Sequence, residues 1–285
     1  MHRDADSPNS MAMIEVIVGA ARSLFPRIET SYLKEVTLHV IDLFEGREEG
    51  IQAADTRYHD LEHTLRATLC WVRIFSGYVR HAPNPLPLTG RHFTIGLTAV
   101  LLHDSGYLRQ EAENGGTGAK YTEIHERRSS ELAAQWLRKR NWPESEIEAV
   151  RHMISCTGPN AVIGSLPFSR PEYRLLGQML CSADYLGQMS DPAYVEKLPV
   201  LFAELQESDD FKGIPLQKRR FRNVDELLAL TPGFWRENVL RKLNVECGGL
   251  CHYLREPFPE GPNWYLEQVE SNLARIKEAR LSSAL

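Results

Sequence analysis

The sequence predicts an all-α protein. Apolar residues recur three and four positions apart along most of the chain, and no segment alternates in the way that a β-strand requires. Residues 13–25 show the helical spacing first, and Pro26 ends the run. Residues 33–44 and 60–75 repeat the pattern. Together these segments are typical of amphipathic helices packed against one another in a bundle.

The next segments extend the same prediction. Three prolines and Gly90 fall in residues 81–90, which predicts a loop. Residues 93–102 are almost entirely apolar, so we expect a helix that is buried on every side. Gly106 follows closely and suits the turn that ends a helix. Further helices are expected over residues 123–140, 143–155 and 171–186.

The character of the chain changes near residue 190. After that point short amphipathic segments alternate with charged or Pro/Gly-containing loops. The expected helices lie near residues 194–207, 224–230, 234–245 and 264–278. We therefore predict a disordered leader (1–12), a metal-binding helical core (13–190) and a C-terminal helical lobe packed on that core (191–285).

Composition narrows the classes of partner. A net charge of −5 argues against a nucleic-acid polymer, and no stretch is long and apolar enough for a membrane span. Cysteines are five in number, scattered and without a CxxC pair, a pattern typical of a reducing cytoplasm. We expect a cytoplasmic protein whose five cysteines pack as small apolar residues (Cys70, Cys156, Cys181, Cys247 and Cys251).

Two histidines stand at the start of the third predicted helix. His59 and His63 are four positions apart, so on a helix both project from one face. They offer two metal ligands, or one ligand beside a proton donor. The alternative is an exposed helix start that happens to carry two imidazoles.

A histidine and an aspartate end the apolar helix. A carboxylate at such a position is costly unless it is paired or bound to metal. His103 and Asp104 are adjacent, so they would point about 100° apart on a helix and reach one ion only where the helix ends. The turn expected at Gly106 predicts such an end. A helix cap formed by the two side chains is the alternative.

Three more residues complete the candidate ligands. Asp184 is a carboxylate inside the apolar helix predicted over residues 171–186. His125 opens one amphipathic helix and His152 closes another, where inward-facing helix ends would complete a second metal position. A buried Asp bonded to backbone and two plain helix-end histidines are the alternatives.

Nitrogen and oxygen ligands of this kind suit one or two divalent ions, with Zn, Mn, Fe, Co and Mg all compatible. Water bound to such an ion loses a proton near neutral pH and becomes a hydroxide nucleophile. A neighbouring imidazole can protonate the leaving oxygen. These residue types therefore match hydrolysis of a phosphoester or pyrophosphate.

The order of these residues resembles the HD-domain superfamily of metal-dependent phosphohydrolases. A histidine (His63), a His-Asp doublet that ends a buried helix (His103-Asp104) and a distant aspartate (Asp184) carry the likeness, over about residues 30–190. The resemblance implies an HD-type helical bundle and metal ligation by these four residues.

Tyr58 to His63 also resembles the Tyr-His-Asn-x-x-His motif of class I cyclic-nucleotide phosphodiesterases, with Asp60 in place of Asn and with Tyr107 where those enzymes have a further His. That likeness makes His59 the proton donor. With His125 and His152 the ligand set is similar to the two-metal branch of the superfamily, which includes diiron oxygenases.

Three functions follow. The first is a phosphohydrolase of a nucleotide or small phosphorylated metabolite, with His59 and Asp104 catalytic. The second is an HD-type diiron oxygenase that cleaves a C–C or C–P bond, and the third is a non-catalytic metal-containing ligand-binding module. The C-terminal lobe is expected to cover the site or to form a homodimer face. Basic residues near His125 are candidates for binding the phosphate (Lys120, Arg127 and Arg128).

Overall fold

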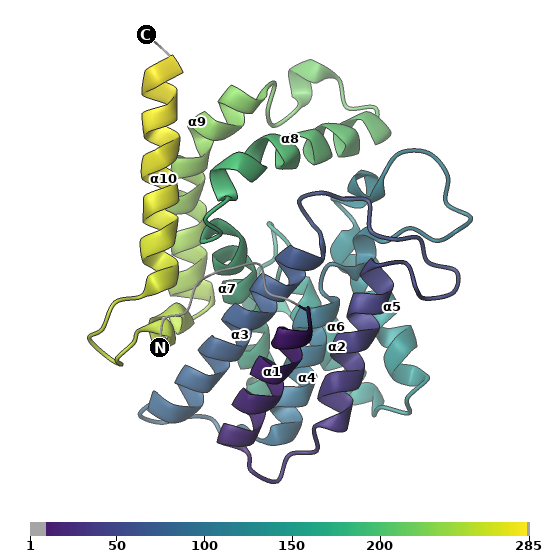
Figure 1. The fold of residues 1–285 in the computed structure, drawn as a ribbon, viewed down its shortest axis with the longest axis vertical. Coiled ribbons are helices and arrows are strands. Elements are labelled where there is room, and N and C mark those ends of the chain that lie inside the picture. The colour runs from purple at the N-terminus through teal and green to yellow at the C-terminus, as the bar shows by residue number, and fades with distance from the viewer. Residues whose placement is uncertain (1–9, 284–285) are drawn as a thin grey trace.

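The computed structural model describes residues 10–283, which form ten α-helices with short 3₁₀ and π-helical turns between them (Figure 1). Within these residues no β-strand is present apart from one isolated bridge between Ile51 and Gln110. The predicted all-α class is confirmed. The helices are α1 (Ser10–Leu24), α2 (Ser31–Phe44), α3 (Leu61–His81), α4 (Gly90–Leu102), α5 (His125–Arg138), α6 (Glu144–Ser155), α7 (Pro171–Met189), α8 (Tyr194–Phe211), α9 (Val224–Phe234) and α10 (Trp264–Ser283).

The predicted leader falls mostly outside the described residues, which begin at residue 10. Residues 10–12 already belong to α1. The third helix is longer than the sequence pattern suggests, because buried Tyr78 continues its apolar stripe beyond residue 75. It ends at His81, two residues before the first proline of the loop.

The apolar helix α4 lies at the centre of the bundle. Every residue from Phe93 to Leu102 is buried, as the uniform hydrophobicity of this segment predicts. Neighbouring helices on all sides cover it, namely α2, α3, α6 and α7. Because α4 is held on all sides, its C-terminal end at His103 has a fixed position inside the bundle.

Helix α3 packs along α7, and the two come unusually close near one end. A Cβ atom on Gly187 of α7 would lie 2.9 Å from the backbone of Ala67 on α3, closer than side-chain packing allows. His63 lies one turn before Ala67, and Asp184 lies three residues before Gly187. The small residues at this crossing therefore allow the two site residues to approach each other.

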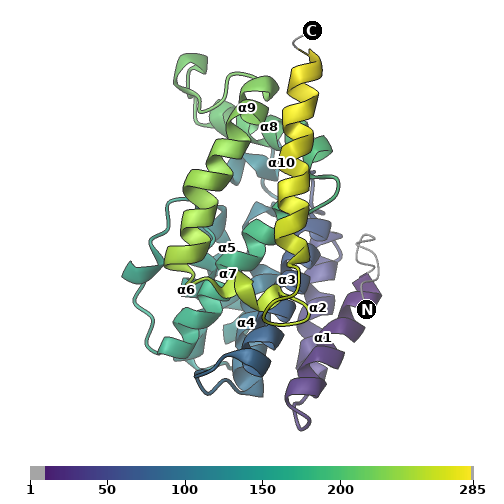
Figure 2. The same cartoon turned by 90° about the vertical axis from the view of Figure 1, so that its left-hand side faces the viewer.

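The residues after 190 pack against the same bundle. Helix α8 crosses above the end of the bundle at which α3 begins, and α10 stands upright and packs against α7 (Figures 1 and 2). Helix α9 packs against α8 and α10. Asn272 of α10 donates hydrogen bonds to the carbonyls of Met189 and Asp191 at 2.9 and 2.8 Å. Buried residues of this part belong to one hydrophobic core with those of α3 and α4.

The segment that follows α9 departs from the predicted regular helix. It forms two π-helical turns, Trp235–Val239 and Lys242–Glu246, in place of a single α-helix over residues 234–245. Within residues 10–283 no helix combines the length and the apolar character needed to cross a lipid bilayer.

Candidate metal centre

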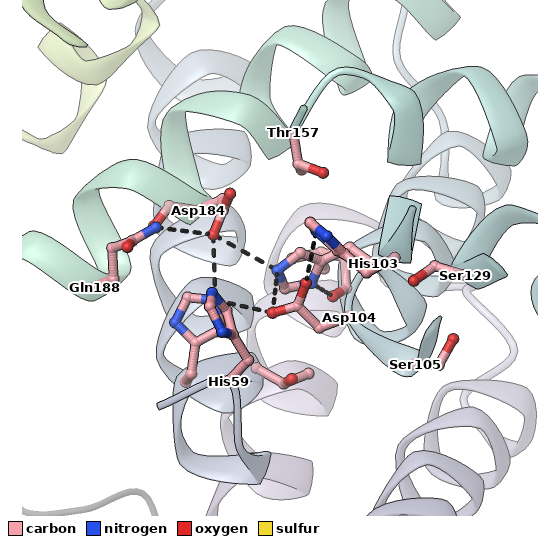
Figure 3. A network of polar contacts seen from close by, with 12 residues as sticks. His59, His103, Asp104, Ser105, Ser129, Thr157, Asp184 and Gln188 are labelled. Carbon is pink, nitrogen blue, oxygen red and sulfur yellow. Dashed lines mark hydrogen bonds and ion pairs between the residues drawn. The ribbon is translucent and has the colours of Figure 1, made fainter. Parts of the chain in front are cut away.

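Three residues that are far apart in the sequence meet in the interior of the bundle. His63, His103 and Asp184 each present one potential ligand atom, and these atoms lie within 4.8 Å of one another. Asp104 joins them from the position next to His103 (Figure 3). All four side chains are buried.

Local structure explains why each side chain faces the others. Asp60 caps α3 by accepting a hydrogen bond from the His63 amide at 2.8 Å, which places His63 in the first turn of the helix. Helix α4 ends at Leu102, and Asp104 then takes a non-helical backbone conformation. That change of direction allows His103 and Asp104 to converge, as the sequence predicts for a doublet at a helix end.

The distances between the polar atoms are short, but hydrogen bonds do not account for them. Nε2 of His63 lies 3.1 Å from Oδ2 of Asp104 and 3.2 Å from Oδ1 of Asp184. Nε2 of His103 lies 3.3 and 3.6 Å from the same two oxygens. Among the described residues, both Nε2 atoms and Oδ2 of Asp104 are buried without a hydrogen-bond partner of acceptable geometry. Two imidazole nitrogens and a carboxylate oxygen that are left unpaired around one point fit a metal ion.

The ring of His103 is held in the orientation that ligation requires. Its Nδ1 lies 2.7 Å from the carbonyl oxygen of Val100, which can only accept, so Nδ1 carries the proton. His125 is held in the same way, with Nδ1 donating to the carbonyl of Thr122 at 2.6 Å. In both residues Nε2 is therefore left with its lone pair free for a metal.

Electrostatics require a positive charge in this cluster. Burial lowers the pKa of His63, but the carboxylates of Asp104 and Asp184 outweigh it and raise the pKa to about 10. The same carboxylates raise the pKa of His103 against the effect of burial. Burial raises the pKa of Asp184, yet the two histidines hold it below its usual range. Protons on imidazoles and a divalent ion are alternative ways to balance the two buried carboxylates.

Asp184 is oriented by a short relay of hydrogen bonds. Gln188, one turn along α7, donates its amide to Oδ1 of Asp184 at 3.3 Å (Figure 3). The Tyr58 hydroxyl donates to the amide oxygen of Gln188 at 3.0 Å. The relay therefore connects Tyr58, the residue before His59, to the carboxylate of Asp184 on α7.

The second oxygen of Asp104 faces a different histidine. Oδ1 lies 3.6 Å from Nε2 of His125, whereas Oδ2 faces His63 and His103. Asp104 thus lies between His125 on one side and His63 and His103 on the other. A carboxylate in this arrangement can bridge two metal ions.

His59 lies beside the cluster and is held by a residue of α8. Its Nδ1 lies 2.7 Å from Oε2 of Glu204, whose other oxygen accepts the amide hydrogens of Arg57 and Tyr58, both at 2.7 Å. Burial raises the pKa of Glu204, but these hydrogen bonds lower it below its ordinary value. The ring centroid of His59 is 5.7 Å from that of His63.

Tyr107 packs against both His59 and His125. Its ring stacks on His59 at 4.4 Å and 11°, and on His125 at 4.5 Å and 20°. The side chain is 1% exposed, and burial raises the pKa of its hydroxyl well above the ordinary value. The three rings form one cluster, in which the centroids of His59 and His125 are 6.2 Å apart.

The sequence did not predict Glu204 or Tyr107 as site residues. Glu204 stands in an ordinary amphipathic segment, and only the path of α8 brings it to His59. Tyr107 follows the His103-Asp104 doublet closely, and this proximity in the sequence was the one indication that it lies at the site.

The structure places His152 in other surroundings. It lies in the last turn of α6, where its ring packs on Phe168 with centroids 5.6 Å apart and its Nε2 is 3.9 Å from Glu148. It is not part of the buried His-His-Asp group within residues 10–283. Its role as a metal ligand stays a prediction.

The three basic candidates also differ in their surroundings. Nζ of Lys120 donates to the carbonyls of Asn114 and Gly115 at 3.4 and 2.7 Å, and the side chain is buried. Arg128 donates to the Gly106 carbonyl at 2.8 Å and, at 3.0–3.1 Å, to the Leu108 carbonyl and the Glu113 carboxylate. Both therefore hold nearby loops together, and only Arg127 has an exposed side chain. Phosphate binding by any of the three stays a prediction.

A surface groove lies away from this cluster. It has a volume of about 720 Å³ and is lined by residues such as Tyr32 and Thr94. It sits at the Gly90 end of α4, whereas His103 is at the other end, roughly 18 Å away at the rise of an α-helix. We therefore take the buried cluster, and not this groove, as the candidate site.

Comparison with known proteins adds no assignment to this geometry. No protein-family model matches the sequence, and a search of curated proteins finds no significant match.

Proposed function

We propose that this protein is an HD-type, metal-dependent phosphohydrolase. The convergence of His63, His103, Asp104 and Asp184 carries the proposal, because two imidazole nitrogens and a carboxylate oxygen are buried there without hydrogen-bond partners. Burying four ionisable groups in this way is costly unless an ion compensates them. The donor set fits Zn, Mn, Fe, Co or Mg.

A divalent ion bound here would supply Lewis acidity toward a phosphoryl oxygen and would lower the pKa of coordinated water. His103 would contribute Nε2, because the carbonyl of Val100 holds the proton on Nδ1. Gln188 would keep the Asp184 carboxylate turned toward the ion.

His59 would serve as the proton donor to the leaving oxygen. Glu204 fixes its Nδ1, so Nε2 is the nitrogen that is free to carry and release the catalytic proton. Tyr107 stacks on the ring and prevents it from turning.

Metal analysis of the purified protein tests this proposal, together with hydrolysis of bis(p-nitrophenyl) phosphate and p-nitrophenyl phosphate under added Mn, Mg, Zn, Co and Fe. We expect one or two transition ions per chain and metal-dependent release of nitrophenol. The variant His59→Ala should keep its metal and lose turnover. Absence of metal after reloading would contradict the metal centre, and metal without hydrolysis would contradict the hydrolase.

A diiron oxygenase is the second candidate. The two oxygens of Asp104 face separate histidines, His63 and His125, and a diiron site would need such a carboxylate. Both classes would use that arrangement. The presence of His59 bonded to Glu204 supports the hydrolase, because an oxygenase needs no leaving-group acid. Oxygen uptake by the iron-loaded protein, absent with zinc, would reverse this order.

A further inference from the structure

The candidate metal centre is largely shut off from solvent in this structure. His63, His103 and Asp104 are at most 5% exposed, and the side chain of His59 is 15% exposed. A phosphoester must nevertheless reach these residues, because an acid at His59 can serve only a leaving oxygen within hydrogen-bond reach. If the protein is the hydrolase proposed above, a part of the chain that covers the centre must therefore move.

Helix α8 provides the cover next to His59. Glu204 of this helix is 6% exposed and contacts the His59 ring. The same carboxylate accepts the amide hydrogens of Arg57 and Tyr58. Helix α8 crosses above the end of the bundle at which α3 begins (Figure 1). Movement of this part of α8 away from the bundle would uncover His59.

The beginning of α8 is firmly fixed. Tyr194 and Leu198, both in its first half, are buried. Asp191, which precedes the helix and is 4% exposed, lies 2.7 Å from Nζ of Lys197 and 3.5 Å from Nε of Arg66 on α3. Apolar burial and buried ion pairs thus hold this end of α8 to the body of the protein.

The second half of α8, residues 200–211, is less firmly packed. Its fully buried residues are Glu204 and Ser208, both polar, and its apolar side chains are partly buried or exposed. Pro199 separates the two halves. Proline has no amide hydrogen for the carbonyl of Val195, so the helix lacks one of its own hydrogen bonds at this point. A helix bends most easily where such a bond is missing.

Polar contacts fasten this second half to the loops beside it. Glu207 accepts a hydrogen bond from the Thr117 hydroxyl at 2.8 Å, a role that the oxygen of an amide would fill as well. Lys212, just after the helix, forms an ion pair with Glu123, whose side chain is 63% exposed. Water can replace polar contacts of this kind at little net cost in free energy, in contrast to the apolar contacts that hold the first half.

We propose that residues 200–211 of α8 form a lid that opens about Pro199 to admit the substrate and closes to complete the active site. Glu204 belongs to the lid and His59 to the body, so opening separates the two side chains and closing brings them together. The His59 ring is therefore held for proton transfer only while the site is closed over its substrate.

Hydrogen exchange at single-residue resolution tests the lid without relying on any activity. The amide hydrogens of Arg57 and Tyr58 are bonded to Glu204, so they exchange when the lid opens. We expect their protection factors to be at least roughly 10-fold below those in the middle of α4 and to be insensitive to low concentrations of denaturant. Equal protection, with the same dependence on denaturant, would mean that α8 moves only when the whole protein unfolds and would overturn the proposal.

A reducible cross-link provides the second test. In the double variant Glu123→Cys/Lys212→Cys, dithiobis(maleimidoethane) should join the end of the lid to the segment before α5. We expect the protection of the Arg57 and Tyr58 amides to rise by at least roughly 10-fold and the hydrolysis of bis(p-nitrophenyl) phosphate to fall by a similar factor. Dithiothreitol should reverse both effects.

Each single variant, Glu123→Cys or Lys212→Cys, treated with the same reagent is the matched control. The five native cysteines are buried, so a single introduced thiol has no accessible partner, and both controls should behave as the unaltered protein does. Slower exchange in a cross-linked protein that hydrolyses no phosphodiester would support the lid and contradict the hydrolase. Exchange and hydrolysis that both continue unchanged after cross-linking would reject the lid and leave the hydrolase in place.

Discussion

Nδ1 of His59 lies 2.7 Å from Oε2 of Glu204, although the two residues are 145 positions apart in the chain. His59 stands just before α3, beside the buried His-Asp cluster, and Glu204 stands on α8. The part of the chain after residue 190 therefore contributes directly to the candidate site. Glu204 also accepts the amide hydrogens of Arg57 and Tyr58 and thereby fixes the backbone that carries His59.

The first prediction concerns this contact. The variant Glu204→Gln should keep its metal content while kcat for phosphodiester hydrolysis falls by roughly 10- to 100-fold, the usual cost of losing a residue that orients a catalytic group. The loss follows because the neutral amide no longer holds the His59 ring by a charge-assisted hydrogen bond.

Glu207, one turn along α8, provides the matched control, because its carboxylate bonds to Thr117 and not to His59. The variant Glu207→Gln should leave kcat close to that of the unaltered protein. A change of the same size in both variants would mean that α8 acts only by holding the loops, and would contradict a specific role for Glu204.

The second prediction separates the histidines. The variant His103→Ala removes a nitrogen that converges on the cluster, and the affinity for Zn²⁺ or Co²⁺ should fall by more than the roughly 100-fold expected when only an orienting residue is lost. The variant His152→Ala should keep at least one ion per chain, because His152 packs on Phe168 away from the buried group. Titration with Co²⁺, followed by its visible absorption, measures both. Equal loss in the two variants would place His152 among the ligands of the first ion.

The sequence predicted the centre of this site for a physical reason. A carboxylate and an imidazole at the end of the wholly apolar helix α4 have few explanations other than ligation, and the likeness of His63 and Asp184 to a family pattern supplied the partners. Glu204 could not be found in this way. Its segment looks like any amphipathic helix, and the contact with His59 depends on the path of α8 across the bundle, which local periodicity does not encode.

Helix boundaries show the same limit. The pattern of apolar residues located α4 and α7 well, because each is buried over most of its length. It did not predict the π-helical turns after α9, because the buried residues Trp235, Val239 and Leu243 stand four apart, a spacing that an ordinary α-helix shows as well. Whether a segment forms a regular α-helix or π-helical turns thus depends on tertiary packing.

The third prediction is a pH dependence of the metal-free protein. The pKa of His63 rises from an ordinary value of 6.5 to about 10 in the folded state, because the attraction of Asp104 and Asp184 outweighs burial. Stability from this group is therefore complete below pH 6.5 and is lost as the pH rises toward 10. Asp184 has a lowered pKa, so its contribution is present above its ordinary pKa and is lost at lower pH.

We therefore expect the metal-free protein to unfold at progressively lower temperature between pH 6.5 and 10, by circular dichroism after chelation. The metal-loaded protein should lose this trend, since the ion replaces the protons, and metal binding at pH 7 should release protons to the buffer. Calorimetric titration in two buffers of different ionisation enthalpy measures that release. A metal-free protein whose stability is constant over this range would contradict the assignment.

The last prediction concerns the crossing of α3 and α7. A Cβ atom at Gly187 would lie 2.9 Å from the backbone of Ala67, so Gly187→Val must push the two helices apart. Because His63 and Asp184 lie within about one turn of this crossing, we expect the free energy of unfolding to fall by about 1–3 kcal/mol and metal affinity to fall with it. Gly19→Ala is the control, because nothing lies within 4 Å of its added Cβ and the helix should gain about 0.5–1 kcal/mol. Urea unfolding with and without Co²⁺ measures both effects. If Gly187→Val lowers stability but binds Co²⁺ with unchanged affinity, the crossing supports the fold without setting the distance between the two ligands.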